Sequence, residues 1–94
     1  MKIVQYKYNG VKVRVVVVEI KTFYKNQKEL AYAINEIIDL YWRNEINEDF
    51  MVSCLKKIIS NNKSKLINDN GFTSIIIQRC GKKRLDLISN ILRE

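Results

Sequence analysis

The sequence has no histidine, no proline, three glycines and two cysteines among its 94 residues. Without histidine, it lacks the side chain that most often acts as a general base near neutral pH and most often gives a metal its nitrogen ligand. Because proline is absent and 47% of the residues are hydrophobic, disorder of the proline-rich kind is not expected. These absences predict a folded protein that does not carry out ordinary hydrolase or zinc chemistry.

Cysteines and long apolar runs are equally scarce. A disulfide scaffold needs an oxidising compartment and more than two cysteines. We therefore expect Cys54 and Cys80 to be reduced, buried thiols. The longest apolar stretch, residues 15–18, is far shorter than the roughly 20 residues that cross a bilayer, and the first residues contain no apolar signal segment. We therefore expect a cytoplasmic protein that makes no contact with a membrane.

The charge of +7 is distributed unevenly along the chain. Residues 1–28 contain seven Lys or Arg and one acid, residues 29–50 one Arg and six acids, and residues 51–94 nine Lys or Arg and three acids. An acidic middle segment thus separates two basic ends. If these ends meet in the fold they form one positive face, which attracts anions over a distance, whereas scattered cations serve only solubility.

The first 20 residues predict a β-hairpin. Residues 2–8 and 11–20 flank Asn9-Gly10, the dipeptide that best fits a two-residue type I′ turn. Strand alternation then divides the hairpin into two faces. The polar face near the turn carries Gln5, Lys7, Lys12 and Arg14, and the apolar face carries Val4, Tyr6, Tyr8, Val11, Val13, Val15 and Val17. Because a lone hairpin is marginal in water, helices of this chain or a second protomer must cover the apolar face.

Two amphipathic helices are predicted next. Asn26 with Glu29 resembles a capping box and begins a helix over residues 27–44, and Asn47 with two following acids begins another. The residues expected to face the core are Leu30, Ile34, Ile37, Ile38, Tyr41 and Trp42 in the first helix, and Phe50, Met51, Cys54, Leu55, Ile58 and Ile59 in the second. Glu29, Glu36 and Asp39 are expected on a solvated face.

The remaining residues predict a reversal and a short helical segment. Residues 68–71, Asn-Asp-Asn-Gly, are a dense turn signal, and Thr73 fits as the cap of a helix over residues 74–79. Three consecutive isoleucines, residues 75–77, suit a buried strand as well as a helix. Gly81 either interrupts or redirects the chain before residues 82–92, whose expected inward residues are Leu85, Ile88, Ile91 and Leu92.

The expected fold is therefore α+β, an N-terminal two-stranded β-hairpin followed by three to four α-helices in a small bundle. Residues 1–94 form a single domain, in which residues 1–21 are the hairpin and residues 22–94 the helical part. No repeat or linker composition divides the chain.

From Thr22 onward the sequence resembles an uncharacterised family of small proteins of phages and prophages of low-GC Gram-positive bacteria. The resemblance is carried by residues 23–31, Ala33-Ile34-Asn35, Tyr41-Trp42, Phe72-Thr73, Gln78, Cys80-Gly81-Lys82 and Arg84-Leu85. It implies a mobile-element setting, and it carries over no activity, cofactor or site residue. The hairpin lies outside it.

Cations form the one local cluster of note. Arg79, Lys82, Lys83 and Arg84 surround Gly81 at an expected helix start, where backbone N–H groups and cationic side chains can hold phosphate. The preceding glycine is Gly71, and its spacing from Gly81 does not match that of a P-loop. Contact with a nucleic-acid backbone requires only that cations are spaced to follow the phosphates. Lys7, Lys12 and Arg14 of the hairpin extend the candidate surface.

The residues predict no catalytic, cofactor or metal site, because the acids of the middle segment fit a solvated helix face and a helix N-terminus better than a Mg²⁺ site. Our first hypothesis is a small non-enzymatic phage or mobile-element protein that contacts nucleic acid, or a nucleic-acid-bound protein complex, through its basic surface. The alternative is a protein-only interaction module, such as an inhibitor of a host or CRISPR-type defence complex, that binds through the hairpin edge or as a homodimer.

Overall fold

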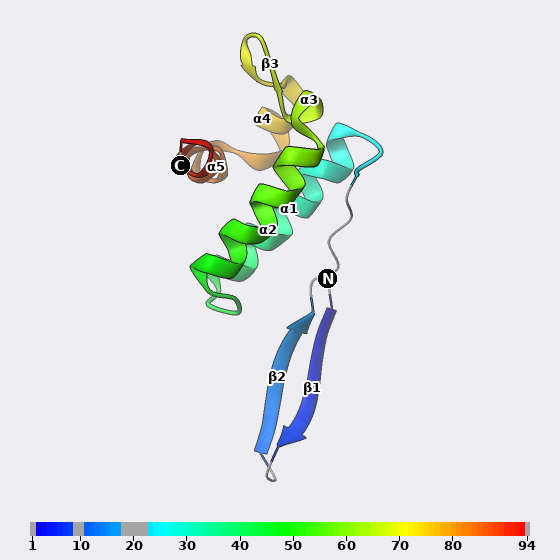
Figure 1. Ribbon diagram of the computed structural model, residues 1–94, viewed down its shortest axis with the longest axis vertical. Coiled ribbons are helices and arrows are strands. Elements are labelled where there is room, and N and C mark those ends of the chain that lie inside the picture. Colours follow the sequence, from blue (N-terminus) through cyan, green and yellow to red (C-terminus); the bar gives the residue numbers. More distant parts are fainter. Residues whose placement is uncertain (1, 9–10, 18–22, 94) are drawn as a thin grey trace.

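The computed structural model describes residues 2–8, 11–17 and 23–93, with side chains described for residues 23–93 (Figure 1). Two ladders of paired strands and five helices occur in these ranges. In chain order they are β1 (Lys2–Tyr8), β2 (Val11–Val17), α1 (Gln27–Trp42), α2 (Glu48–Asn61), α3 (Lys63–Leu66), β3 (Ile67–Asn68), β4 (Gly71–Phe72), α4 (Ser74–Cys80) and α5 (Lys82–Leu92).

β1 and β2 form an antiparallel two-stranded ladder. Its register places Tyr8 opposite Val11, Lys7 opposite Lys12 and Gln5 opposite Arg14. In Figure 1 the ladder extends from the helices along the longest dimension of the molecule, which measures 54 Å against 24 and 22 Å for the other two. The sequence predicts that helices or a second protomer cover the apolar face of this ladder, but the side chains of that face lie outside those described.

Polar side chains define both ends of α1. The Oδ1 atom of Asn26 accepts a hydrogen bond from the Glu29 N–H at 2.9 Å, which confirms the predicted N-cap. The Glu29 carboxylate accepts in turn from the Lys25 N–H, one residue before the position a capping box uses. At the other end Asn44, with φ of 61°, occupies the left-handed position, and the Glu45 N–H donates to the Leu40 carbonyl. This is a Schellman motif, so the helix reverses cleanly toward α2.

The second helix begins as predicted, since Asn47 Oδ1 accepts from the Phe50 N–H at 2.8 Å. Its end is fixed by Asn62, whose side chain is buried. The Oδ1 atom of Asn62 accepts from the Tyr24 N–H at 3.0 Å, and its Nδ2 donates to the Ile58 carbonyl at 2.8 Å. A buried amide that is satisfied on both sides ties the segment before α1 to the end of α2.

A second strand ladder corrects the predicted architecture. β3 and β4 pair across Asp69-Asn70, and the turn is closed by a bond from the Asn70 N–H to Asn68 Oδ1 at 2.9 Å. The sequence indicated the reversal but not these strands, because two-residue strands have no detectable alternation. The predicted α+β fold, with every strand before three to four helices, is therefore wrong in the order and number of its elements. Residues 23–93 are mainly helical, at 73%.

The last two helices differ from the prediction in one capping contact. The three isoleucines are helical, which settles the alternative left open above, and α4 extends to Cys80. Thr73 lies at the N-cap, but its hydroxyl donates to the Lys65 carbonyl at 3.0 Å and makes no capping bond. Thr73 thus joins α4 to α3 instead of closing its own helix. Gly81, with φ of 81°, separates α4 from α5.

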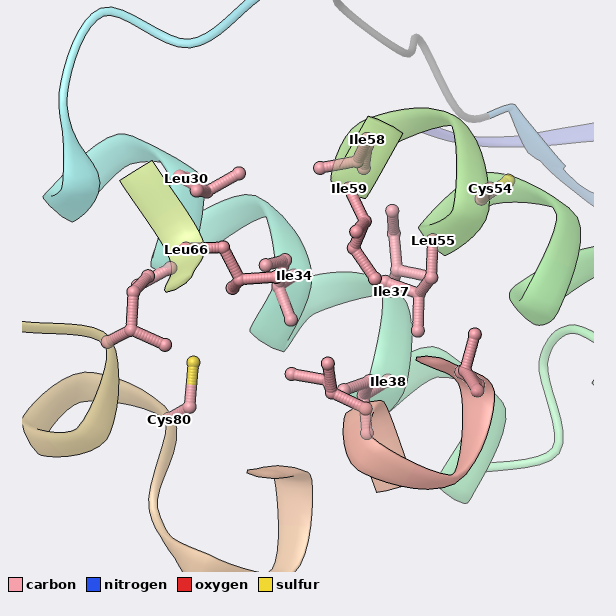
Figure 2. Packing of buried hydrophobic residues seen from close by; sticks show 14 of the residues in the cluster. Leu30, Ile34, Ile37, Ile38, Cys54, Leu55, Ile58, Ile59, Leu66 and Cys80 are labelled. Atoms are coloured by element: carbon pink, nitrogen blue, oxygen red, sulfur yellow. The ribbon is translucent and has the colours of Figure 1, made fainter. Parts of the chain in front are cut away.

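The core is formed by one cluster of apolar side chains between the helices (Figure 2). The cluster comprises Tyr24, Leu30, Ala31, Ile34, Ile37, Ile38, Met51, Cys54, Leu55, Ile58, Ile59, Leu66, Ile76, Cys80, Ile88 and Ile91. Three residues predicted to face inward are exposed instead: Trp42 at 46%, Phe50 at 42% and Leu92 at 38%. Each lies in the first or last turn of its helix, where the neighbouring helices no longer cover the stripe.

Candidate functional site

The cationic cluster predicted around Gly81 lies where α4 passes into α5. The side chains of Arg79, Lys82 and Lys83 are exposed, and Gly81 between them is exposed as well. Within residues 23–93, no carboxylate forms an ion pair with any of these three cations. Gly81 adopts a positive φ that other residues rarely adopt, so the two short helices meet at a sharp bend. Three exposed positive charges without a carboxylate partner in residues 23–93 are thereby gathered at the α4–α5 junction.

Arg84 differs from the other three cations because its guanidinium is bonded within the protein. Its Nη2 lies 2.7 Å from Asp39 Oδ1 and 3.0 Å from Asp39 Oδ2, and its Nε lies 3.0 Å from Oδ1. Its Nη1 donates to the Cys80 carbonyl at 2.9 Å, and the group stands 5.6 Å from the centre of the Trp42 ring. The expectation that Asp39 is simply solvated is wrong. Arg84 instead fastens the start of α5 to α1.

Asn35 makes a second link between α1 and the junction. Its Nδ2 donates to the Arg79 carbonyl at 2.9 Å, while its Oδ1 is buried without a hydrogen-bond partner. The Arg79 backbone is thus held to α1, and its side chain extends to solvent. Together, Asn35 and Asp39 hold the junction at two successive turns of α1, so the three exposed cations are carried by an anchored backbone.

The N-terminus of α5 adds to the positive potential. Its N-cap residue is Gly81, which has no side chain to accept a bond from the first backbone N–H groups, and the first turn contains no acidic residue. The partial positive charge of a helix N-terminus therefore coincides with Lys82 and Lys83. Natural helices more often place carboxylates there, as α2 does with Glu48 and Asp49.

The hairpin cations of the predicted surface are placed by their backbone. Lys7 and Lys12 face each other across the ladder, and Arg14 pairs with Gln5. Their side chains, and any continuity with the junction that the basic-face hypothesis requires, lie outside the described residues.

Tyr32 is a surface residue that the sequence analysis did not identify. It lies on α1 and is 67% exposed, more than any other large hydrophobic side chain described for residues 23–93. A hydrogen bond from its hydroxyl to the Glu36 carboxylate, together with the negative charge of Glu36, raises the pKa of Tyr32. Helical spacing is the signal in the sequence that indicates its exposure. Leu30, Ala31 and Ile34 share the buried face of the helix, and Tyr32, which lies between them in the sequence, does not.

Two shallow hollows lie elsewhere on the described surface. One, of about 310 Å³, is lined by Glu45, Ile46, Asn47 and Phe50 at the turn between α1 and α2. The other, of about 300 Å³, is lined by Ile67, Gly71, Phe72, Ser89, Leu92 and Arg93, between the β3–β4 ladder and the end of α5. Neither includes the cationic cluster, and neither gathers titratable groups for catalysis.

The remaining reactive groups are enclosed. Cys54 and Cys80 are free thiols buried in the core, and burial raises the pKa of both. Protonated, enclosed thiols are poor nucleophiles. Within residues 23–93 the acids and cysteines nowhere form a group of three suited to a metal ion. The helices of that range are also too short or too polar for any one of them to span a bilayer.

The fold and this site define a small, mainly helical protein that presents an anchored cationic surface at the α4–α5 junction. The chain belongs to a family of conserved hypothetical proteins, whose model matches residues 21–93. This confirms a relationship to an uncharacterised family over the helical part of the chain, and β1 and β2 lie before the matched residues. Comparisons with curated proteins and with solved structures give no match.

Proposed function

We propose that this protein is a non-enzymatic binding protein that contacts nucleic acid, or a nucleic-acid-bound protein complex, through Arg79, Lys82 and Lys83. The proposed setting is the cytoplasm of a bacterial host cell that carries a phage or other mobile element. Lys7, Lys12 and Arg14 of the hairpin are proposed to extend the surface. Arg84 is given a positioning role, because its guanidinium is engaged by Asp39 and the Cys80 carbonyl.

The observation that carries this proposal is the combination of exposed charge and an anchored backbone. The three cations have no carboxylate partner within residues 23–93, and they surround a helix N-terminus without a side-chain cap. The segment that carries them is bonded to α1 on both sides, by Asn35 at the Arg79 carbonyl and by Asp39 at the Arg84 guanidinium. Phosphate contacts need positive charge and spacing more than a shaped pocket, and neither hollow of the described surface includes these residues.

The experiment is a salt titration of binding to fluorescently labelled single-stranded and duplex oligonucleotides, followed by polarisation. Counterion release predicts that affinity falls as salt rises. The triple variant Arg79→Glu, Lys82→Glu and Lys83→Glu should bind more weakly and lower the log–log salt slope by about 2 on single strands or about 3 on duplex, if each cation neutralises one phosphate.

A matched control reverses the same amount of charge elsewhere. Lys25, Lys57 and Lys63 are exposed on other segments of the helical part, and their replacement by Glu changes the net charge equally. This control should retain most of the affinity and the original slope. Binding that is unchanged by salt, or an equal loss in both triple variants, would contradict a phosphate surface at the junction.

The second candidate is a protein-only module, and the β1–β2 ladder favours it. The ladder has two strands only, so each strand leaves one edge of backbone groups unpaired within the ladder. Such an edge can add a strand from a host or defence protein, or from a second copy of this chain. Nuclease treatment separates the two functions, because a stoichiometric protein partner that remains bound after nuclease favours the edge.

A further inference from the structure

Tyr32 has the exposure and the chemistry of a surface for stacking. Two-thirds of its surface is accessible, the largest exposed fraction of any large hydrophobic side chain described for residues 23–93. Glu36, one helical turn later, raises the pKa of Tyr32, so the phenol is neutral at physiological pH. A neutral flat ring is suited to contact with another flat ring.

The position of Tyr32 relative to the cations follows from the contacts of α1. Asn35, three residues later, bonds the Arg79 carbonyl at 2.9 Å, and Asp39, two turns after Tyr32, bonds Arg84. Residues at these spacings share one side of a helix, so Tyr32 lies on the flank of α1 that the α4–α5 junction borders. Lys28, one turn before Tyr32, is also exposed on this flank. Within residues 23–93, the most exposed aromatic ring thus lies on the side of α1 that borders the three exposed cations.

We propose that Tyr32 is a stacking platform for an unpaired base, and that the ligand of the α4–α5 surface is single-stranded nucleic acid whose phosphates contact Arg79, Lys82 and Lys83. This inference rests on the proposed function and specifies its ligand. In a duplex the faces of the bases are already stacked on one another, so a protein ring reaches them only in an unpaired strand. Grooves that combine cations with aromatic rings are the usual means of binding single strands without strong sequence preference.

The test compares variants of one residue on two ligands. A labelled 20-nucleotide thymidine strand and the same strand annealed to its complement are titrated with the wild type and with Tyr32→Ala, Tyr32→Leu and Tyr32→Phe. Stacking predicts that Tyr32→Ala weakens single-strand binding about fivefold to 150-fold, that Tyr32→Leu weakens it comparably, and that Tyr32→Phe retains it. Duplex binding should be weaker in the wild type and insensitive to these changes.

Phe50→Ala is the matched control, because Phe50 is another exposed aromatic residue and lies at the start of α2, beside Glu45, Ile46 and Asn47. It should leave single-strand binding unchanged. Each variant must also melt near the wild-type temperature, which is expected for Tyr32→Ala because an exposed alanine favours a helix.

The outcomes distinguish this inference from the proposed function. If the wild type binds duplex as tightly as single strand and Tyr32→Ala has no effect, the stacking inference is overturned while the phosphate surface stands. If the wild type binds neither ligand in low salt, both are overturned. A preference for the single strand that disappears in Tyr32→Ala and is restored in Tyr32→Phe is the expected result.

Discussion

The bond between Arg84 and Asp39 provides a quantitative test of how the α4–α5 junction is held. The guanidinium makes three contacts of 2.7–3.0 Å with the carboxylate, and the two side chains remain 27% and 36% exposed. Fully exposed ion pairs contribute about 0.2–1 kcal/mol, whereas breaking a buried pair costs about 3–5 kcal/mol. A partly exposed, bidentate pair lies between these limits, so we expect a coupling free energy of about 1 kcal/mol.

The two single substitutions should lower the free energy of unfolding by different amounts. Asp39→Ala removes only the carboxylate, whereas Arg84→Ala also removes the bond to the Cys80 carbonyl and the contact with the Trp42 ring. We expect Asp39→Ala to lower the free energy of unfolding by about 1 kcal/mol and Arg84→Ala by about 2 kcal/mol. For a domain of this size each kcal/mol corresponds to a melting shift of about 4–8 °C.

The measurement is a double-mutant cycle by urea denaturation, followed by circular dichroism. Arg43→Ala is the control, since Arg43 is 63% exposed in its ion pair with Glu45 and should cost less than about 0.5 kcal/mol. A coupling below about 0.3 kcal/mol, with Arg84→Ala no more harmful than this control, would show that the pair does not hold the junction.

Three further predictions concern the helical part. Leu30→Ala removes a fully buried side chain and should lower the free energy of unfolding by about 2–5 kcal/mol in urea denaturation; a change under about 1 kcal/mol would contradict the assigned core. Asn44→Ala places a Cβ without a compensating amide at a φ of 61° and should cost about 1 kcal/mol, whereas Asn44→Gly should be neutral or stabilising by the same measurement. Burial raises the pKa of Cys54 and Cys80 above the ordinary value of 9.0, so the unfolded chain loses these protons first. The free energy of unfolding should therefore fall as pH rises past that value, and it should fall more in the wild type than in a Cys→Ala double variant. A thiol reagent should label the protein only after denaturation.

The sequence was most informative where a local signal determines the structure. Asn26 and Asn47 marked the starts of two helices because an N-cap needs only a side chain and the next backbone N–H groups. The interior positions of the apolar stripes, such as Ile34 and Leu55, are buried as their periodicity predicts. Both kinds of signal depend on neighbours within one turn of the chain.

The features that the sequence did not predict depend on contacts between distant segments. Trp42 and Phe50 satisfy the helical period, yet no neighbouring element covers the ends of α1 and α2, so both are exposed. Threonine is a residue type that often caps a helix, but the Thr73 hydroxyl donates instead to the Lys65 carbonyl in α3. Thr73 and Lys65 are close in the sequence, but their bond depends on how α3 and α4 pack, and periodicity contains no information about such packing.

The candidate site shows the same division. The sequence located the four cations around Gly81, because a cluster of charge is visible in one dimension. That Asp39, 45 residues away, engages Arg84, and that Asn35 bonds the Arg79 carbonyl, depends on the packing of α4 and α5 on α1. The site that we propose therefore comprises Arg79, Lys82 and Lys83 without Arg84, and adds Tyr32.

The most direct test of a nucleic-acid surface at the α4–α5 junction is an NMR titration of the isotope-labelled protein with a short single strand. We predict that backbone shifts concentrate at Arg79, Lys82, Lys83 and Tyr32, and that they diminish when salt is raised. Shifts confined to the turn between α1 and α2, or no shifts at any ratio of strand to protein, would contradict a nucleic-acid surface at the junction.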